Sequence, residues 1–181
     1  MNQRLNISEK GNELEVTILS YRDKLKTTLL MIWLGFWLAC GVISFGELIH
    51  SSGGENRIFW LVFESFWAYF LYAVTKALVW RLKGFESILL DKEGLKYARR
   101  IFGKEPYKTY NLSEISKFQK ASLDSNALFS VYENAYWFVG GESIAFMVNG
   151  KEMRLGTQLN EKELKDLLSK LKFFHQHLVK G

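Results

Sequence analysis

The chain has 181 residues, 48% of them hydrophobic, a formal net charge of +5 and a single cysteine. One cysteine excludes an intrachain disulfide, so a disulfide-stabilised extracellular domain is not expected. The positive charge comes without a nucleic-acid recognition motif, and we therefore expect no nucleic-acid partner.

Residues 1–24 precede a long apolar run and are predicted to contain β structure. Leu14, Val16 and Ile18 alternate with polar residues, which is the period of a half-buried strand. The preceding sequence Glu9-Lys-Gly-Asn12 is typical of a turn. We expect a short β-hairpin or a single strand, and the pattern does not decide whether it joins the domain that follows.

Residues 25–83 are predicted to form a transmembrane helical hairpin. The spans cover about 27–49 and 58–80, and about 20 helical residues are enough to cross a hydrocarbon core of about 30 Å. The connector 50–57 is short, polar and glycine-rich, which makes the two helices antiparallel neighbours. A signal peptide is disfavoured because the first apolar run starts late and a second follows at once.

Flanking basic residues predict the orientation of the hairpin. The connector contains Arg57, whereas the open end of the hairpin is flanked by Arg22, Lys24, Lys26, Arg81 and Lys83. Under the positive-inside rule, both termini lie in the cytoplasm and the connector lies outside. We therefore expect a protein that is integral to the plasma (inner) membrane.

Small residues spaced four apart suggest how the two helices pack. Gly35 and Ala39 have this spacing on the first span, and Ala73 and Ala77 have it on the second. Such pairs let helix backbones approach closely, so we predict that they lie at the contact between the helices.

Residues 84–181 are predicted to form a β-rich cytoplasmic domain of about seven short strands followed by one helix. Expected strands cover 85–90, 95–102, 107–111, 115–123, 128–139, 144–148 and 153–155. Gly94 is expected to take a positive φ in a tight turn, and Asn149-Gly150 favours a type I′ turn. Apolar residues at helical spacing over 164–178 predict an amphipathic helix, with a capping box formed by Asn160 and Glu163.

This order resembles the bacterial pleckstrin-homology-like (PH-like) domain, which often stands beside a transmembrane hairpin. The local likeness lies in Asp91-Lys-Glu-Gly-Leu95 and the later Leu112-Ser-Glu-Ile-Ser116. The resemblance implies a bent, partly open barrel of about seven strands with a C-terminal amphipathic helix at one end. The layout, with Lys92-Glu-Gly94 soon after the second span, also resembles the photosystem I assembly factor family.

Few residues have the patterns of catalysis or metal binding. The common motifs for nucleophiles, zinc proteases, phosphate loops and dinucleotides are missing from the sequence, so we expect no enzyme activity and no cofactor. His175 and His177 are two apart, which places them on different sides of a helix, and we expect solvated side chains rather than a metal site. Cys40 is expected to be a buried apolar residue.

Two features remain as candidate sites. Glu64 is ionisable and lies inside a span, which makes it a functional candidate. The alternative is a carboxyl group bonded to a hydroxyl of the neighbouring helix, such as that of Ser44. A basic group with acidic residues interleaved is a candidate contact for anionic lipid or a partner protein, and it comprises Arg99, Arg100, Lys104 and Lys108.

The leading functional hypothesis is a non-catalytic, membrane-anchored scaffold that acts through protein–protein interaction. The PH-like domain would bind membrane or cytoplasmic partner proteins, as an accessory subunit or assembly factor of a larger complex. One alternative is a sensor of anionic inner-leaflet lipid. Another is a proton-linked enzyme or transporter that uses Glu64.

Overall fold

The computed structural model describes residues 4–21, 23–51, 53–101, 103, 105–121 and 141–180. The chain separates into two compact units. One unit is 22–81, and the other combines 1–21 with 82–181. The second unit is therefore assembled from chain segments on both sides of the first.

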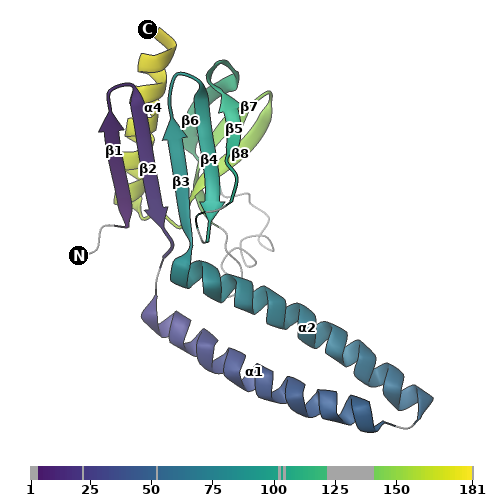
Figure 1. Ribbon diagram of the computed structural model, residues 1–181. Coiled ribbons are helices and arrows are strands. Elements are labelled where there is room, and N and C mark those ends of the chain that lie inside the picture. The colour runs from purple at the N-terminus through teal and green to yellow at the C-terminus, as the bar shows by residue number, and fades with distance from the viewer. Residues whose placement is uncertain are drawn as a thin grey trace. The chain divides into compact units, whose positions relative to one another are not determined.

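The unit 22–81 is an antiparallel pair of long helices, α1 (Lys24–His50) and α2 (Gly54–Lys83) (Figure 1). Asp23 caps α1 by accepting a hydrogen bond from the amide of Lys26 at 3.2 Å. Both helices are long and apolar enough to cross a bilayer. Only 17% and 6% of their most apolar 18-residue stretches are buried, whereas a core helix of a soluble protein would bury most of such a stretch.

The predicted pair of helices is confirmed, but the connector is shorter than expected. The helix α2 begins at Gly54, so the second half of the expected connector 50–57 is helical. The amide of Arg57 donates to the carbonyl of Gly53 at 3.0 Å, which closes the first turn of this helix. Glycine at this point does not prevent the helix from starting, because a helix end tolerates it better than a helix interior does.

The second unit contains eight described strands in two antiparallel sheets. A five-stranded sheet has the order β1-β2-β3-β4-β5, formed by β1 (Leu5–Lys10), β2 (Glu13–Leu19), β3 (Phe85–Leu90), β4 (Gly94–Arg100) and β5 (Lys108–Asn111). A three-stranded sheet has the order β6-β7-β8, formed by β6 (Ile115–Lys120), β7 (Glu142–Val148) and β8 (Lys151–Thr157). The short 3₁₀ helix η1 (Leu112–Glu114) connects the two sheets.

The amino-terminal segment is a β-hairpin, and it belongs to the five-stranded sheet. The strand β2 pairs with β3 from Leu14↔Leu90 to Leu19↔Phe85. These two strands lie on opposite sides of the helical pair in the sequence, so the helices are an insertion between neighbouring strands of one sheet. Short-range sequence patterns cannot predict that two strands about 70 residues apart pair with each other.

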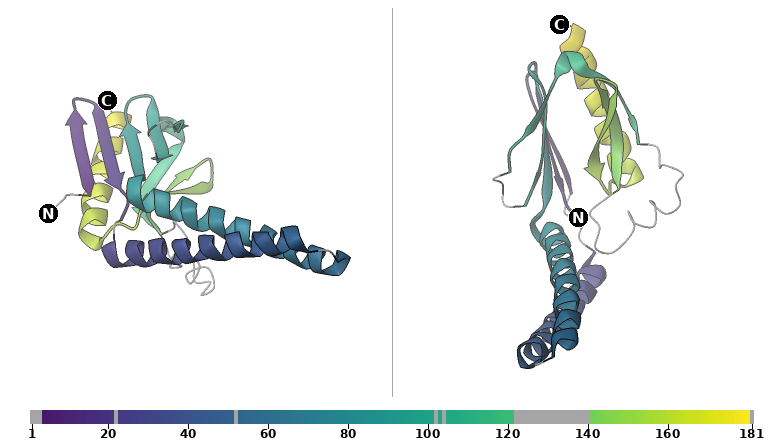
Figure 2. Two further views of the ribbon diagram at one scale, coloured as in Figure 1. Left: turned by 60° about the horizontal axis from the view of Figure 1, so that its bottom comes forward. Right: turned by 90° about the vertical axis from the view of Figure 1, so that its right-hand side faces the viewer.

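The three-stranded sheet and α4 (Glu161–Lys180) together cover one face of the five-stranded sheet (Figure 2). One continuous apolar core joins these three layers, with Ile88 from β3, Phe146 from β7 and Leu167 from α4 among its fully buried members. The expected alternation in β2 is confirmed, because Leu14, Val16 and Ile18 all point into this core.

Three local predictions are confirmed. Gly94 has a φ of 147°, and a Cβ at this position would overlap the carbonyl of Tyr110. Asn149 and Gly150 have φ values of 50° and 78°, as a type I′ turn requires. At the start of α4, the side chain of Asn160 accepts the amide of Glu163 at 2.8 Å, and the Glu163 carboxylate accepts the amide of Asn160 at 3.0 Å.

The observed strands differ from the predicted strands mainly in where they begin and end. The strand expected at 95–102 is observed as 94–100, and the one expected at 115–123 ends at Lys120. The strand expected at 128–139 lies outside the described residues. The described strands form two sheets linked by η1 and packed with a helix.

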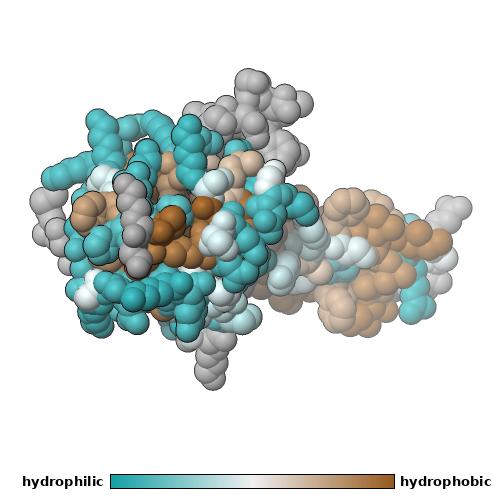
Figure 3. Space-filling view, turned by 90° about the horizontal axis from the view of Figure 1, so that it is seen from above, coloured by the Kyte–Doolittle hydropathy of each residue, from teal (hydrophilic) through white to brown (hydrophobic). Residues whose placement is uncertain are grey.

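The surfaces of the two units differ in polarity. Figure 3 shows mainly hydrophilic residues over the viewed face of the β unit and mainly hydrophobic residues over the helical pair at the right. Exposed side chains on the helices include Phe36, Val42 and Ile43 on α1 and Phe66 and Tyr69 on α2. Exposed apolar side chains on this scale are typical of a surface that faces lipid.

Candidate functional site

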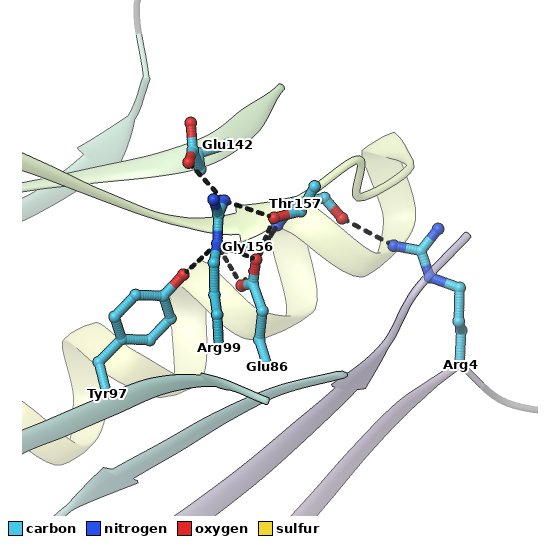
Figure 4. A network of polar contacts seen from close by, with 7 residues as sticks. All are labelled: Arg4, Glu86, Tyr97, Arg99, Glu142, Gly156 and Thr157. Atoms are coloured by element: carbon cyan, nitrogen blue, oxygen red, sulfur yellow. Dashed lines mark hydrogen bonds and ion pairs between the residues drawn. The ribbon is translucent and has the colours of Figure 1, made fainter. Parts of the chain in front are cut away.

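Among the described residues of the β unit, an extensive polar network is centred on Glu86 of β3, whose side chain is only 1% exposed (Figure 4). Its carboxylate accepts hydrogen bonds from the amides of Gly156 at 2.8 Å and Thr157 at 3.2 Å, and from the Thr157 hydroxyl. A buried carboxylate needs several such donors, because transfer from water costs several kcal/mol. Glu86 therefore ties the five-stranded sheet to the end of β8.

Arg99 of β4 completes this network by bridging two carboxylates. Its Nε donates to Glu86 at 3.3 Å and to the Tyr97 hydroxyl at 3.0 Å. Its Nη2 donates to Glu142 of β7 and to the Thr157 hydroxyl. The guanidinium thus connects the two sheets (Figure 4), and its planar array of donors suits this arrangement better than a lysine would.

The network shifts the pKa values of Tyr97 and Arg99. Burial raises the pKa of the Tyr97 phenol well above its ordinary value, and the nearby negative charge of Glu86 raises it further. Burial alone would lower the pKa of Arg99, but its contacts with Tyr97, Glu86 and Glu142 outweigh burial and raise it. A neutral phenol and a charged guanidinium are therefore stable at neutral pH.

The four basic candidates do not form one group in the structure. Arg99 lies in the network between the sheets, whereas the Arg100 guanidinium lies 4.2 Å from the centre of the Tyr107 ring on the outer face. Lys108 is an exposed residue of β5, and its Cα partner across the sheet is Tyr97. Lys104 lies outside the described residues. Alternation along β4 separates Arg99 from Arg100, because successive side chains of a strand point to opposite faces.

Within the helical pair, the buried positions of both helices alternate in steps of three and four residues. Buried or half-buried positions on α1 include Thr27, Leu30, Leu34, Trp37, Gly41, Ser44 and Leu48. Those on α2 include Trp60, Glu64, Trp67, Leu71, Val74 and Leu78. We call these two series the helix seam. A 3-4 repeat is the signature of knobs-into-holes packing of neighbouring helices.

Two tryptophans join the helices by hydrogen bonds in the middle of the helix seam. The Trp37 Nε1 donates to the carbonyl of Trp67 at 3.2 Å, and the Trp67 Nε1 donates to the carbonyl of Trp37 at 2.9 Å. The Trp67 ring lies against Gly41, where a Cβ would overlap the indole. Such reciprocal bonds satisfy both indole donors inside an apolar helix pair, where an unsatisfied donor is costly.

The small-residue prediction is wrong for the first span. Gly35 and Ala39 are exposed, and nothing lies within 4 Å of a Cβ built on Gly35. Ala73 is half-buried and Ala77 is buried on α2. The close approach on α1 occurs at Gly41 instead, because the seam follows a seven-residue repeat that includes Gly41 and excludes Gly35.

Glu64 also belongs to the helix seam, and its carboxyl group meets a hydroxyl of the other helix. The Ser44 hydroxyl lies 2.5 Å from Glu64 Oε1 and 3.1 Å from the carbonyl of Gly41. A hydrogen bond between Glu64 and Ser44 is what we expected if Glu64 has no functional role. Each side chain thereby supplies the polar partner that the other needs within an apolar helix pair.

We predict that Glu64→Gln leaves the stability of the helical pair within about 0.5 kcal/mol of wild type, since an amide oxygen can still accept from Ser44. Ser44→Ala removes the donor and should cost about 1 kcal/mol. Unfolding of the purified chain in detergent micelles, followed by tryptophan fluorescence, measures both. Equal losses in the two variants would contradict a simple hydrogen-bond role.

Asp91 organises the turn between β3 and β4. Its carboxylate accepts the amides of Glu93 at 2.8 Å and Gly94 at 3.1 Å, and the Lys96 ammonium lies at 3.0 Å. Burial alone would raise the pKa of Asp91, but the hydrogen bonds from Lys96 and the two amides outweigh it and lower the pKa.

This lowered pKa predicts a pH dependence of stability. The folded-state pKa of Asp91 lies below its ordinary value of 3.8, so the ionised carboxylate stabilises the fold above that value. The stabilisation is lost as the pH falls through the folded-state pKa. The stability difference between wild type and Asp91→Asn should therefore be constant above about pH 5 and shrink progressively as the pH is lowered below about 4, as measured by urea unfolding. A difference that stayed constant over the whole pH range would contradict the assignment.

The histidines of α4 and the cysteine of α1 each contribute to packing within their own unit. His175 packs edge-on against Phe118 with ring centres 5.6 Å apart, and is therefore not the solvated residue that the sequence predicted. His177 stacks on Phe173, and Cys40 is half-buried in the helical pair. Among the described residues, no group of three or more His, Cys, Asp or Glu side chains could hold a metal ion.

Sequence reasoning missed Glu86 and Gly41. A signal for Glu86 was present, since a charged residue at an inward position of a strand is unusual and requires a buried partner. The signal for Gly41 was the 3-4 repeat of α1, which runs through Trp37, Gly41 and Ser44. Among known proteins, neither a family model nor a curated protein matches this chain.

Proposed function

We propose that the chain is a non-catalytic scaffold anchored in the plasma (inner) membrane by the helical hairpin, with both termini in the cytoplasm. The β unit is proposed to be a PH-like domain that binds partner proteins, as an accessory subunit or assembly factor. The apolar exterior of the two helices supports the anchor. The order of strands and the terminal helix packed on the sheets support the PH-like domain.

The observation that carries the membrane topology in this proposal is the pairing of β2 with β3. Leu19 and Phe85 are Cα partners, and the amide of Ser20 donates to the carbonyl of Gly84 at 3.0 Å. Paired residues of an antiparallel sheet lie about 5 Å apart. The chain therefore leaves the sheet and returns to it at one place, which requires an even number of membrane crossings and favours a two-helix hairpin.

A scaffold also needs a rigid body to present to a partner, and the polar network provides rigidity. Glu86, Arg99 and Glu142 fix the two sheets relative to each other, and each charge has a partner of opposite sign. These residues satisfy one another, so they support a structural role for the network rather than a catalytic one.

Labelling of single cysteines tests the membrane topology. In a Cys40→Ser background, Gly53→Cys in the connector should react with a membrane-impermeant maleimide added to intact cells. Asn12→Cys, in the turn between β1 and β2, should react only after permeabilisation. Reaction of both sites in intact cells would overturn the proposed orientation, and release of the protein by alkaline carbonate would overturn membrane insertion.

Copurification tests the scaffold function. The full chain is extracted with a mild detergent, separated by size exclusion and examined by mass spectrometry. A partner protein present in a fixed ratio supports the proposal and identifies the complex. A pure monomer or homo-oligomer under these conditions would overturn the scaffold role as stated.

A further inference from the structure

The five-stranded sheet carries an exposed apolar patch at the end where the chain enters and leaves the helical pair. We define the sheet-end patch as Leu19, Tyr21, Phe85, Arg100 and Tyr107. Leu19, Tyr21 and Tyr107 are exposed. Outside α1 and α2, the other large apolar side chains that the described residues expose lie on α4. The patch is therefore a local concentration of exposed apolar surface among the described residues of the β unit.

Strand register places Leu19, Phe85 and Arg100 on one level of the sheet, and the Tyr107 ring lies against Arg100. Leu19 is the Cα partner of Phe85, and Phe85 is the Cα partner of Arg100. Ile18 points into the core, so its neighbour Leu19 and the residues level with it point to the outer face. Figure 1 shows this end of the sheet, where β3 follows α2 in the chain.

Arg100 is held in a fixed position within the patch. Its guanidinium lies 4.2 Å from the centre of the Tyr107 ring and donates to the carbonyl of Gly103 at 3.3 Å. The Tyr107 hydroxyl is in turn 3.0 Å from the Ser87 hydroxyl. A guanidinium has five N–H donors, so this arrangement leaves donors to bind an oxyanion.

We propose that the sheet-end patch rests in the lipid headgroup layer, where Arg100 binds the phosphate of an anionic phospholipid. This inference rests on the membrane insertion proposed above. Phe85 follows the last residue of α2, Lys83, by two positions, which corresponds to at most about 7 Å of chain. The headgroup layer on each side of a bilayer is about 5–8 Å thick.

The chemistry of the patch fits that layer. Tyrosines combine an apolar ring with a polar hydroxyl and are enriched at the membrane–water interface. Leu19 and Phe85 would pack among the headgroups, and the arginine would bind phosphate. The opposite end of β3 is about 17 Å along the strand from Phe85, at about 3.3 Å per residue over five residues, which exceeds the thickness of the headgroup layer.

Spin labels on the full chain in vesicles of phosphatidylcholine and phosphatidylglycerol test the depth of the patch. In the Cys40→Ser background, a label at Leu19→Cys should be protected from a water-soluble nickel complex. A label at Lys92→Cys, at the opposite end of β3, serves as the matched control and should be fully accessible. Equal access at both sites in protein that resists alkaline carbonate would overturn the inference, whereas extraction by carbonate would overturn the membrane anchor itself.

A second measurement tests the phosphate contact. Arg100→Gln should lower the preference of the protein for spin-labelled phosphatidylglycerol over phosphatidylcholine by up to about fivefold, which corresponds to about 1 kcal/mol per basic residue near the surface. Lys151→Gln, a charge change at the first residue of β8, should leave the preference unchanged. An unchanged preference in Arg100→Gln, or protection of the Leu19 label by a copurifying protein in detergent, would overturn the proposal.

Discussion

Arg99→Met should destabilise the β unit by about 3 kcal/mol, the lower part of the range for removing one partner of a buried ion pair. Methionine retains most of the volume of the side chain but leaves Glu86 and Glu142 without their shared cation. Glu86 keeps three donors from Gly156 and Thr157, whereas Glu142 loses the guanidinium. The Arg99 side chain is 33% exposed, so water offsets part of the loss.

Hydrogen–deuterium exchange of the full chain measures this effect, because it reports opening of β3 and β8 separately from the helices. Arg154→Met is a matched control, since Arg154 is 26% exposed and its Nε lies 2.7 Å from Glu152 on the same strand. Such a pair contributes about 1 kcal/mol or less. Equal losses in Arg99→Met and Arg154→Met would contradict the assignment of Arg99 as the link between the sheets.

A double-mutant cycle separates the ion pair from packing. If the cost of Arg99→Met comes from the unpaired carboxylate of Glu142, then Glu142→Gln should cost less in the Arg99→Met background than in wild type. The coupling should be about 1–3 kcal/mol, as is usual for contacting charged groups. Additive losses would show that Arg99 acts through its packing alone.

Local structure in this chain follows from local sequence. The turn at Gly94, the type I′ turn at Asn149-Gly150 and the capping box at Asn160 each depend on residues a few positions apart, and all three are confirmed. The two long apolar helices likewise follow from composition and length. Each of these features is stabilised by contacts within one segment, so the sequence pattern contains the information needed to predict it.

Long-range pairing could not be predicted in the same way. The ladder between β2 and β3 and the contact of Glu86 with Thr157 join segments about 70 residues apart. Arg99 and Arg100 are adjacent in sequence, and their charge alone placed them in one candidate group. The pleat of β4 separates them, so that one connects the sheets and the other stacks on Tyr107.

Gly41→Leu should destabilise the helical pair by about 3 kcal/mol, the upper part of the range for overpacking a well-packed contact. A Cβ at Gly41 would overlap the Trp67 indole. The ring cannot move aside without cost, because its Nε1 donates to the carbonyl of Trp37 at 2.9 Å. Unfolding of the purified chain in detergent micelles, followed by tryptophan fluorescence, measures the loss.

Gly35→Leu is the matched control for this substitution, since it lies on the same helix and a Cβ there meets nothing within 4 Å. It should change stability by about 0.5 kcal/mol or less, as is usual for surface positions. Trp67→Ala should partly rescue Gly41→Leu, because it removes the ring that the leucine meets and leaves space for the new side chain to fill. If Gly35→Leu and Gly41→Leu were equally destabilising, the helices would not pack through the seam that contains Trp37, Gly41 and Trp67. The contact would then lie on the face of α1 that carries Gly35 and Ala39, as their four-residue spacing first suggested.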